Sequence, residues 1–261
     1  MLSYVVMKTT WIGFENIREA VVRQAQSACG MEENMSYKIV VDSCCELPEK
    51  YKKDPHFEIV PLGLEVGDYR IMDDEHFNQK EFLEQVASCP QCPRSSCPSP
   101  ESYRQAFESE AEHIYVVTLS GNLSGSYNSA MVAKKMANEK YPHKKIHVID
   151  SKSAGPGLAM IAIKLKEILD SDVEFDKAVE MIEVYRDKTK LLFVLETLDN
   201  LMKNGRVSRI QGSMAGILGI KILCGASDHG TIDVLKKCRG KLSAYDNLIK
   251  EMGNKGYNSG K

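Results

Sequence analysis

The chain has 261 residues, of which 43% are hydrophobic and 27% are charged, and its formal net charge is −2. This near-neutral charge argues against a nucleic-acid surface as the main function, and no apolar run approaches the roughly 20 residues of a membrane span. The length allows one large domain or two modest ones.

The first 34 residues differ in pattern from those that follow. Residues 16–28 carry apolar side chains at helical spacing, which predicts an amphipathic helix, and residues 30–34 interrupt that pattern. We therefore expect residues 1–34 to be an N-terminal extension. Because no charged segment precedes a sustained apolar run, we predict no signal peptide and a cytoplasmic location with reduced cysteines.

Strand-like and helix-like segments alternate in residues 35–170. We expect strands at residues 38–42, 114–118 and 145–150, an extended segment at 58–66, and helices at 46–53, 78–88, 99–112, 126–140 and 156–169. This alternation, with strands rich in Val and Ile, predicts a first α/β domain with a mainly parallel sheet covered by helices on both faces.

The pattern changes after residue 170, where we place a domain boundary. Helices are expected at residues 175–189, 196–204 and 241–252, and strands at 191–195 and 231–239, with an apolar, glycine-rich stretch at 213–224. Residues 171–261 are therefore expected to form a second, smaller α/β domain.

Residues 119–129 are rich in glycine and serine and lie between an expected strand and an expected helix. The free N–H groups and the dipole of a helix N-terminus favour an anion, glycine lets a ligand approach the backbone, and hydroxyls add neutral donors. We therefore predict an anion site here, with Ser120, Gly121, Ser124 and Gly125 as candidate contacts.

Two aspartates and two serines give further candidate side chains. Asp42 and Asp150 each close an expected strand, where they can cap the next turn or act as a catalytic pair of a hydrolase or phosphatase. Ser95 and Ser96 precede a helix that Ser99 is expected to cap, so their hydroxyls can contact a ligand or lie at the surface.

The eight cysteines include one Cys-x-x-Cys pair, Cys89 and Cys92, with Cys97 nearby. A structural zinc site needs four ligands, and although His76 and His113 could be recruited, the spacing does not require it. We predict no metal site and no cofactor, and we find no Ser-centred catalytic motif and no P-loop.

Taken in order, several segments resemble the DegV family. They are Asp42-Ser-x-x-x-Leu-Pro48, Val60-Pro-Leu62, Ser95-Ser-x-Pro-Ser-Pro100, Leu119-Ser-x-x-Leu-Ser-Gly-Ser-Tyr-Asn-Ser129, Asp150-Ser151 with Gly155-x-Gly157, and Leu201-Met-Lys-Asn-Gly-Arg-Val-Ser208. The resemblance extends from about residue 38 to about residue 241, and its specificity comes from the order of the motifs.

The resemblance implies a bacterial fatty-acid-binding protein of two α/β domains that buries a palmitate-like acyl chain in an apolar tunnel. It implies a non-enzymatic carrier that presents the carboxylate to an ATP-binding fatty acid kinase subunit for phospholipid synthesis, with transient membrane contact allowed. The carboxylate would be held by Ser95, Ser96 and residues 119–125, and Arg186 and Arg206 would dock the kinase.

This sequence departs from the family pattern at several positions. Gly121 replaces a serine, Cys97 replaces a glutamine and Asn204 replaces a glycine of the family motifs. Family members also continue past the helix expected at residues 241–252, so the second domain is expected to be truncated. A small-molecule hydrolase using Asp42 and Asp150, and a degraded relative that binds no lipid, stay open as alternatives.

Overall fold

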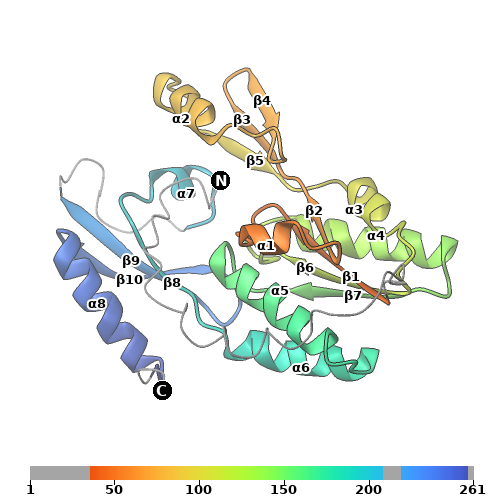
Figure 1. Cartoon of the computed structure of the whole chain (residues 1–261). Coiled ribbons are helices and arrows are strands. Elements are labelled where there is room, and N and C mark those ends of the chain that lie inside the picture. Colours follow the sequence, from red (N-terminus) through yellow and green to blue (C-terminus); the bar gives the residue numbers. More distant parts are fainter. Residues whose placement is uncertain (1–35, 208–218, 258–261) are drawn as a thin grey trace.

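The computed structural model describes residues 36–207 and 219–257, and its first layer is a four-stranded parallel sheet (Figure 1). The strand order is β2-β1-β6-β7, and the strands are β1 (Tyr37–Asp42), β2 (Phe57–Val60), β6 (His113–Thr118) and β7 (Lys145–Asp150). Because all four run in one direction, the loops that follow them meet at a single edge, where ligands bind in open α/β sheets.

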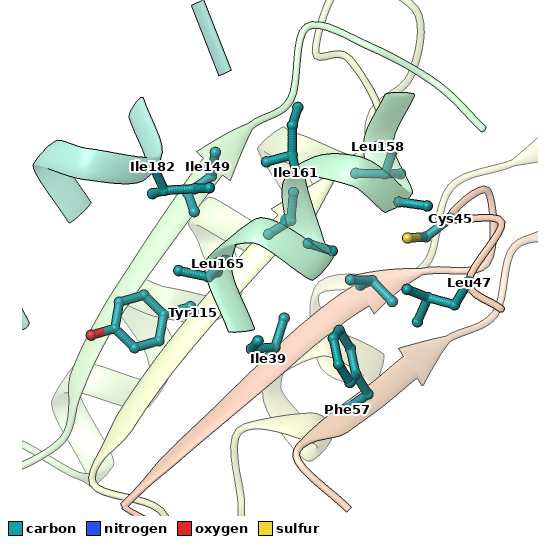
Figure 2. Packing of buried hydrophobic residues seen from close by; sticks show 14 of the residues in the cluster. Ile39, Cys45, Leu47, Phe57, Tyr115, Ile149, Leu158, Ile161, Leu165 and Ile182 are labelled. Atoms are coloured by element: carbon teal, nitrogen blue, oxygen red, sulfur yellow. The ribbon is translucent and has the colours of Figure 1, made fainter. Parts of the chain in front are cut away.

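Alternate side chains of these strands enter two separate cores. On one face, Ile39 and Tyr115 pack with Ile161 of α5 (Pro156–Leu169) and Ile182 of α6 (Phe175–Lys188) (Figure 2). On the other face lie α3 (Pro100–Ala106) and α4 (Ser126–Lys140), which bury their alanines and Tyr103 against the sheet. The predicted parallel sheet with helices on both faces is confirmed.

A second sheet is antiparallel and has the order β10-β9-β8. Its strands are β8 (Leu192–Leu195), β9 (Ile220–Ala226) and β10 (Ile232–Arg239), and they are accompanied by α7 (Asp199–Lys203) and α8 (Lys241–Asn254). The buried Ala244 of α8 packs with Leu223 and Cys238, so one face of this sheet has a small core of its own. The expected strands and helices of this part are present.

A third, small sheet was not predicted from the sequence. It joins β3 (Gly63–Val66), β4 (Tyr69–Met72) and β5 (Arg94–Ser96) in the order β4-β3-β5, next to α2 (Gln79–Ser88). The segment expected to be extended at residues 58–66 is therefore split between two sheets at Pro61, which has no N–H for a ladder. Residues 94–96, for which no strand was predicted, pair with β3.

Three expected helices are shorter than predicted, and one of them, α7, covers only residues 199–203 of the expected 196–204. The first, α1 (Glu49–Lys52), begins only after Pro48, and α3 ends at Ala106 before a run of acidic residues, which are unfavourable at a helix C-terminus. The domain boundary near residue 170 stays a prediction, since α6 beyond it packs Phe175, Ala178 and Ile182 into the first core. Residues 1–34 lie outside the described residues.

Candidate functional site

A cavity of about 320 Å³ lies between the edge of the parallel sheet, β5 and the α7 region. Its apolar lining comes from β8, from α7 and from the loops after β2 and β6: Phe193, Leu195, Leu201, Leu62, Leu119 and Leu123. Its polar lining includes Ser95, Ser96, Cys97, Ser124, Gly125, Thr197, Asn200, Asn204 and Arg206. A small cavity with leucine walls and clustered hydroxyls suits a ligand that has an apolar body and one polar group.

The N-terminus of α4 lies at the polar part of this cavity. Gly125 is its N-cap residue, and the Ser124 hydroxyl accepts a 3.2 Å hydrogen bond from the N–H of Ser126. A Cβ atom at Gly125 would lie 2.8 Å from the sulfur of Cys97, so glycine permits the close approach of this loop to β5. The helix dipole and the loop N–H groups favour a negative charge here.

The two serines of β5 reach the cavity through the small third sheet. Ser95 pairs with Leu64 and Ser96 with Gly63, and both serines are exposed. A Cβ atom at Gly63 would lie 2.5 Å from the Ser96 hydroxyl, so this glycine makes room for the hydroxyl. The unpredicted β3–β5 pairing thus places the Ser95-Ser96 segment opposite the α4 N-terminus.

Asp42 and Asp150 hold the loop between β6 and α4 from both sides. The Oδ2 atom of Asp42 accepts from the N–H of Leu119 at 2.7 Å, and Oδ1 of Asp150 accepts from Gly121 at 3.0 Å and Lys152 at 2.9 Å. Burial raises the pKa of Asp42 to about 6, and the Leu119 N–H partly offsets this effect. Both carboxylates have a structural role, as the capping interpretation expects.

Ser120 and Gly121 do not line the cavity. The Ser120 hydroxyl is buried and donates to the carbonyl of Gly230 at 2.7 Å. The Gly121 N–H is engaged by Asp150. Of the six predicted carboxylate contacts, the structure therefore brings four together at the cavity: Ser95, Ser96, Ser124 and Gly125.

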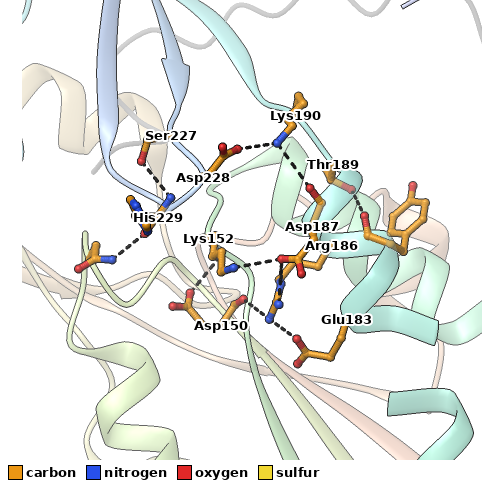
Figure 3. Close-up of polar contacts among 12 residues, drawn as sticks. Asp150, Lys152, Glu183, Arg186, Asp187, Thr189, Lys190, Ser227, Asp228 and His229 are labelled. Atoms are coloured by element: carbon orange, nitrogen blue, oxygen red, sulfur yellow. Dashed lines mark hydrogen bonds and ion pairs between the residues drawn. The ribbon is translucent and has the colours of Figure 1, made fainter. Parts of the chain in front are cut away.

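The two predicted docking arginines lie at different places. Arg206 is exposed at the cavity, where its Nε donates to the Leu123 carbonyl at 2.7 Å. Arg186 lines a separate cleft of about 300 Å³ and forms ion pairs with Glu183 and Asp187 (Figure 3). A protein that docks over the cavity would therefore contact Arg206. Arg186 lies elsewhere, and its guanidinium already forms ion pairs within this chain.

Sequence reasoning missed the residues that the second sheet and α7 contribute. Phe193 and Leu195 were expected in a strand but not at a ligand site, and Thr197, Asn200 and Leu201 had no predicted role. The alternation of β8 predicts buried side chains but not the cavity that they line. Within residues 36–207 and 219–257, no three His, Cys, Asp or Glu side chains are grouped so that they could hold a metal ion.

Comparison with known proteins identifies the family. The family model described as "Uncharacterised protein, DegV family" matches residues 36–261. This chain belongs to the DegV family. A DegV domain-containing protein of Streptococcus pneumoniae is 41% identical over 226 residues, which cover 83% of this chain and 79% of the relative. A DegV domain-containing protein of Streptococcus pyogenes is 39% identical over 229 residues, covering 87% and 81% of the two chains.

Solved DegV structures similar to this chain contain fatty acids. A Ruminococcus gnavus DegV family protein with vaccenic acid is 41% identical at a TM-score of 0.82, with 87% of this chain and 81% of that chain covered. The Streptococcus pneumoniae Fatty Acid Kinase (Fak) B3 protein loaded with linoleic acid is 40% identical at 0.80, with 85% and 80% covered. An Eubacterium eligens DegV family protein loaded with heptadecanoic acid is 33% identical at 0.80, with 86% and 80% covered.

The DegV architecture seen in these relatives is the α/β fold described above. None of the helices in the described part of this DegV chain is long and apolar enough to cross a membrane.

Proposed function

We propose that this chain binds a long-chain fatty acid in the cavity between the parallel sheet and the β10-β9-β8 sheet. The observation that carries the proposal is that leucines and Phe193 line the same cavity as Ser95, Ser96, Ser124 and the α4 N-terminus. Burial of the acyl chain contributes about 0.8 kcal/mol per CH₂ group, or on the order of 10 kcal/mol for a palmitate-like tail. The head group then needs orientation by neutral donors and not a buried cation.

The relatives support this assignment by the ligands that they contain. Vaccenic, heptadecanoic and linoleic acids are bound in DegV proteins that are 33–41% identical to this chain. These relatives also favour a role as a fatty-acid carrier over a role as an enzyme. The hydrolase alternative has less support, because Asp42 and Asp150 are both engaged by backbone N–H groups.

Native mass spectrometry of the purified protein tests the proposal. We expect a bound C14–C18 acid that organic extraction releases, and uptake of palmitate after delipidation. Replacement of Ser95 and Ser96 together by Ala should weaken palmitate binding, since both hydroxyls line the cavity. Replacement of Ser171, an exposed serine with its hydroxyl on the Glu167 carbonyl, is a matched control. A ligand-free mass with no palmitate uptake would favour the degraded, non-binding relative.

We further propose that the bound carboxylate is presented to an ATP-binding kinase subunit. The relative named as a Fatty Acid Kinase protein supports this role, and Arg206 is exposed beside the cavity. Hydroxamate trapping of acyl phosphate, with palmitate-loaded protein, ATP and the kinase subunit of Streptococcus pneumoniae, would detect the reaction. An Arg206→Ala variant that still binds palmitate should form less product, whereas an unchanged rate would remove Arg206 from the proposal.

A further inference from the structure

Asp42 is a fully buried acid directly behind the proposed head-group site. Its side chain has no solvent exposure, and its Oδ2 atom is bonded to the N–H of Leu119, a cavity-lining residue. Its Oδ1 atom has no partner in good hydrogen-bond geometry within the described residues, and the nearby Ser126 hydroxyl and Cys44 N–H only partly offset the effect of burial on the pKa of Asp42. A buried carboxylate with one unsatisfied oxygen is costly to ionise, so a proton is readily accommodated on that oxygen.

A short path of hydroxyls leads from Asp42 toward the cavity. The Ser126 hydroxyl is near enough to favour the ionised form of Asp42, and it lies 3.4 Å from the hydroxyl of Ser124, which lines the cavity. Ser126 is itself fully buried at the first turn of α4. A ligand carboxylate at Ser124 would therefore be separated from Asp42 by the buried Ser126 hydroxyl.

The titratable neighbours of Asp42 within the described residues carry no positive charge. From the segment after β1, the Cys44 N–H and the Cys45 thiol interact with it, and from α3 the phenol of Tyr103 does. No Lys, Arg or His among residues 36–207 and 219–257 forms an ion pair with it. A ligand carboxylate that binds nearby carries the same charge as ionised Asp42, so its arrival disfavours ionisation of Asp42.

We propose that the protein takes up one proton from solvent on Asp42 when it binds the anionic form of a fatty acid. The proposal rests on the proposed function, because the anion is the ligand carboxylate at Ser124 and Gly125. The proton goes to a carboxylate oxygen of Asp42 and returns to solvent when the ligand leaves. Loading is therefore favoured at lower pH, and the neutral Asp42 keeps its bond to the Leu119 N–H.

Isothermal titration calorimetry of the delipidated protein with dodecanoate, in buffers of different ionisation enthalpy, counts the protons taken up. For the wild type we expect net uptake, and an affinity that falls by about tenfold between about pH 6 and 8 for each unit of pKa change on Asp42. The Asp42→Asn variant keeps an acceptor for Leu119 but cannot ionise. This variant should bind dodecanoate at least as tightly as the wild type at about pH 8, and its affinity should not change with pH.

Two controls separate this effect from a change in structure or in the ligand. Asp150→Asn removes another carboxylate that holds the same loop, and it should keep the wild-type proton uptake. The carboxyl resonance of carbon-labelled dodecanoate reports whether the bound ligand is ionised, so it tests the wild type without any substitution. A protonated ligand, or equal uptake by Asp42→Asn, overturns the inference, and no binding at any pH overturns the proposed function with it.

Discussion

The hydroxyl of Ser120 donates a 2.7 Å hydrogen bond to the carbonyl of Gly230, 110 positions further along the chain. Ser120 belongs to the loop between β6 and α4, and Gly230 to the turn between β9 and β10. The contact is buried and joins the parallel sheet to the antiparallel one. Because the proposed fatty-acid cavity takes residues from both sheets, the geometry of the cavity depends on such contacts.

Replacing Ser120 with Ala should destabilise the protein by about 1–3 kcal/mol, because the buried Gly230 carbonyl loses its donor. Urea unfolding measures the change. The control is Asn122→Ala, which removes an exposed bond from Nδ2 to the His229 carbonyl and should cost less than about 1 kcal/mol. Equal losses in the two variants would contradict a special role for the buried contact.

Gly230 should tolerate no side chain. A Cβ atom there would lie 2.8 Å from the Cα of Lys152 and 2.3 Å from the Ser120 hydroxyl, at a φ of +80°. Gly240 has a φ of +79° with no atom within 4 Å of such a Cβ, so Gly240→Ala carries the left-handed strain of about 1 kcal/mol and no clash.

We therefore expect Gly230→Ala to cost at least about 2 kcal/mol more than Gly240→Ala in denaturant unfolding. The same variant should weaken palmitate binding, because the turn at Gly230 can no longer approach the loop that carries Ser124. Similar stabilities for the two variants would mean that the two sheets can separate here at no cost.

Gly63→Ala should impair the head-group site with little effect on the fold. The new methyl group would lie 2.5 Å from the Ser96 hydroxyl, which is the movable end of an exposed side chain and can rotate away. We expect weaker palmitate binding by fluorescence competition and a free energy of unfolding within about 1 kcal/mol of the wild type.

The control for this substitution is Gly253→Ala in α8, where a Cβ atom would meet nothing within 4 Å. Palmitate affinity should be unchanged in this variant. Unchanged affinity in Gly63→Ala as well would argue that the Ser96 hydroxyl does not contact the carboxylate.

The elements around the parallel sheet could be predicted because their signals are local. Helix α4 follows a glycine N-cap and α5 begins at Pro156, and both have the bounds expected from the sequence. The sheet itself follows from strands that alternate with these helices.

The cavity could be predicted only in part, because long-range contacts decide which polar groups face it. Ser120 and Gly121 look like ligand contacts in the sequence, but a turn 110 positions away engages the first and Asp150 engages the second. The pairing of Ser95 with Leu64 and the arrival of Phe193 from another sheet likewise have no local signal.

Asp42→Asn should raise stability in a pH-dependent manner. The pKa of Asp42 in the folded protein is about 6, above the value of about 3.9 in an unfolded chain, because burial disfavours the charged form. The folded state thus binds more protons between about pH 4 and 6, and the stability of the wild type falls as pH rises through that window. The cost above it is on the order of 3 kcal/mol.

The asparagine variant has no such cost, so the difference in melting temperature between variant and wild type should grow from about pH 4 to 6 and then stay level. Glu108→Gln is a control of opposite sign. Hydrogen bonds from Lys140 and Arg104 lower the pKa of Glu108 to about 2, so its stabilising contribution is lost only as pH falls below about 4. The difference in melting temperature between Glu108→Gln and the wild type should therefore stay constant from about pH 5 to 6. A difference that rises over this range would assign the effect to the net charge of the protein and not to Asp42.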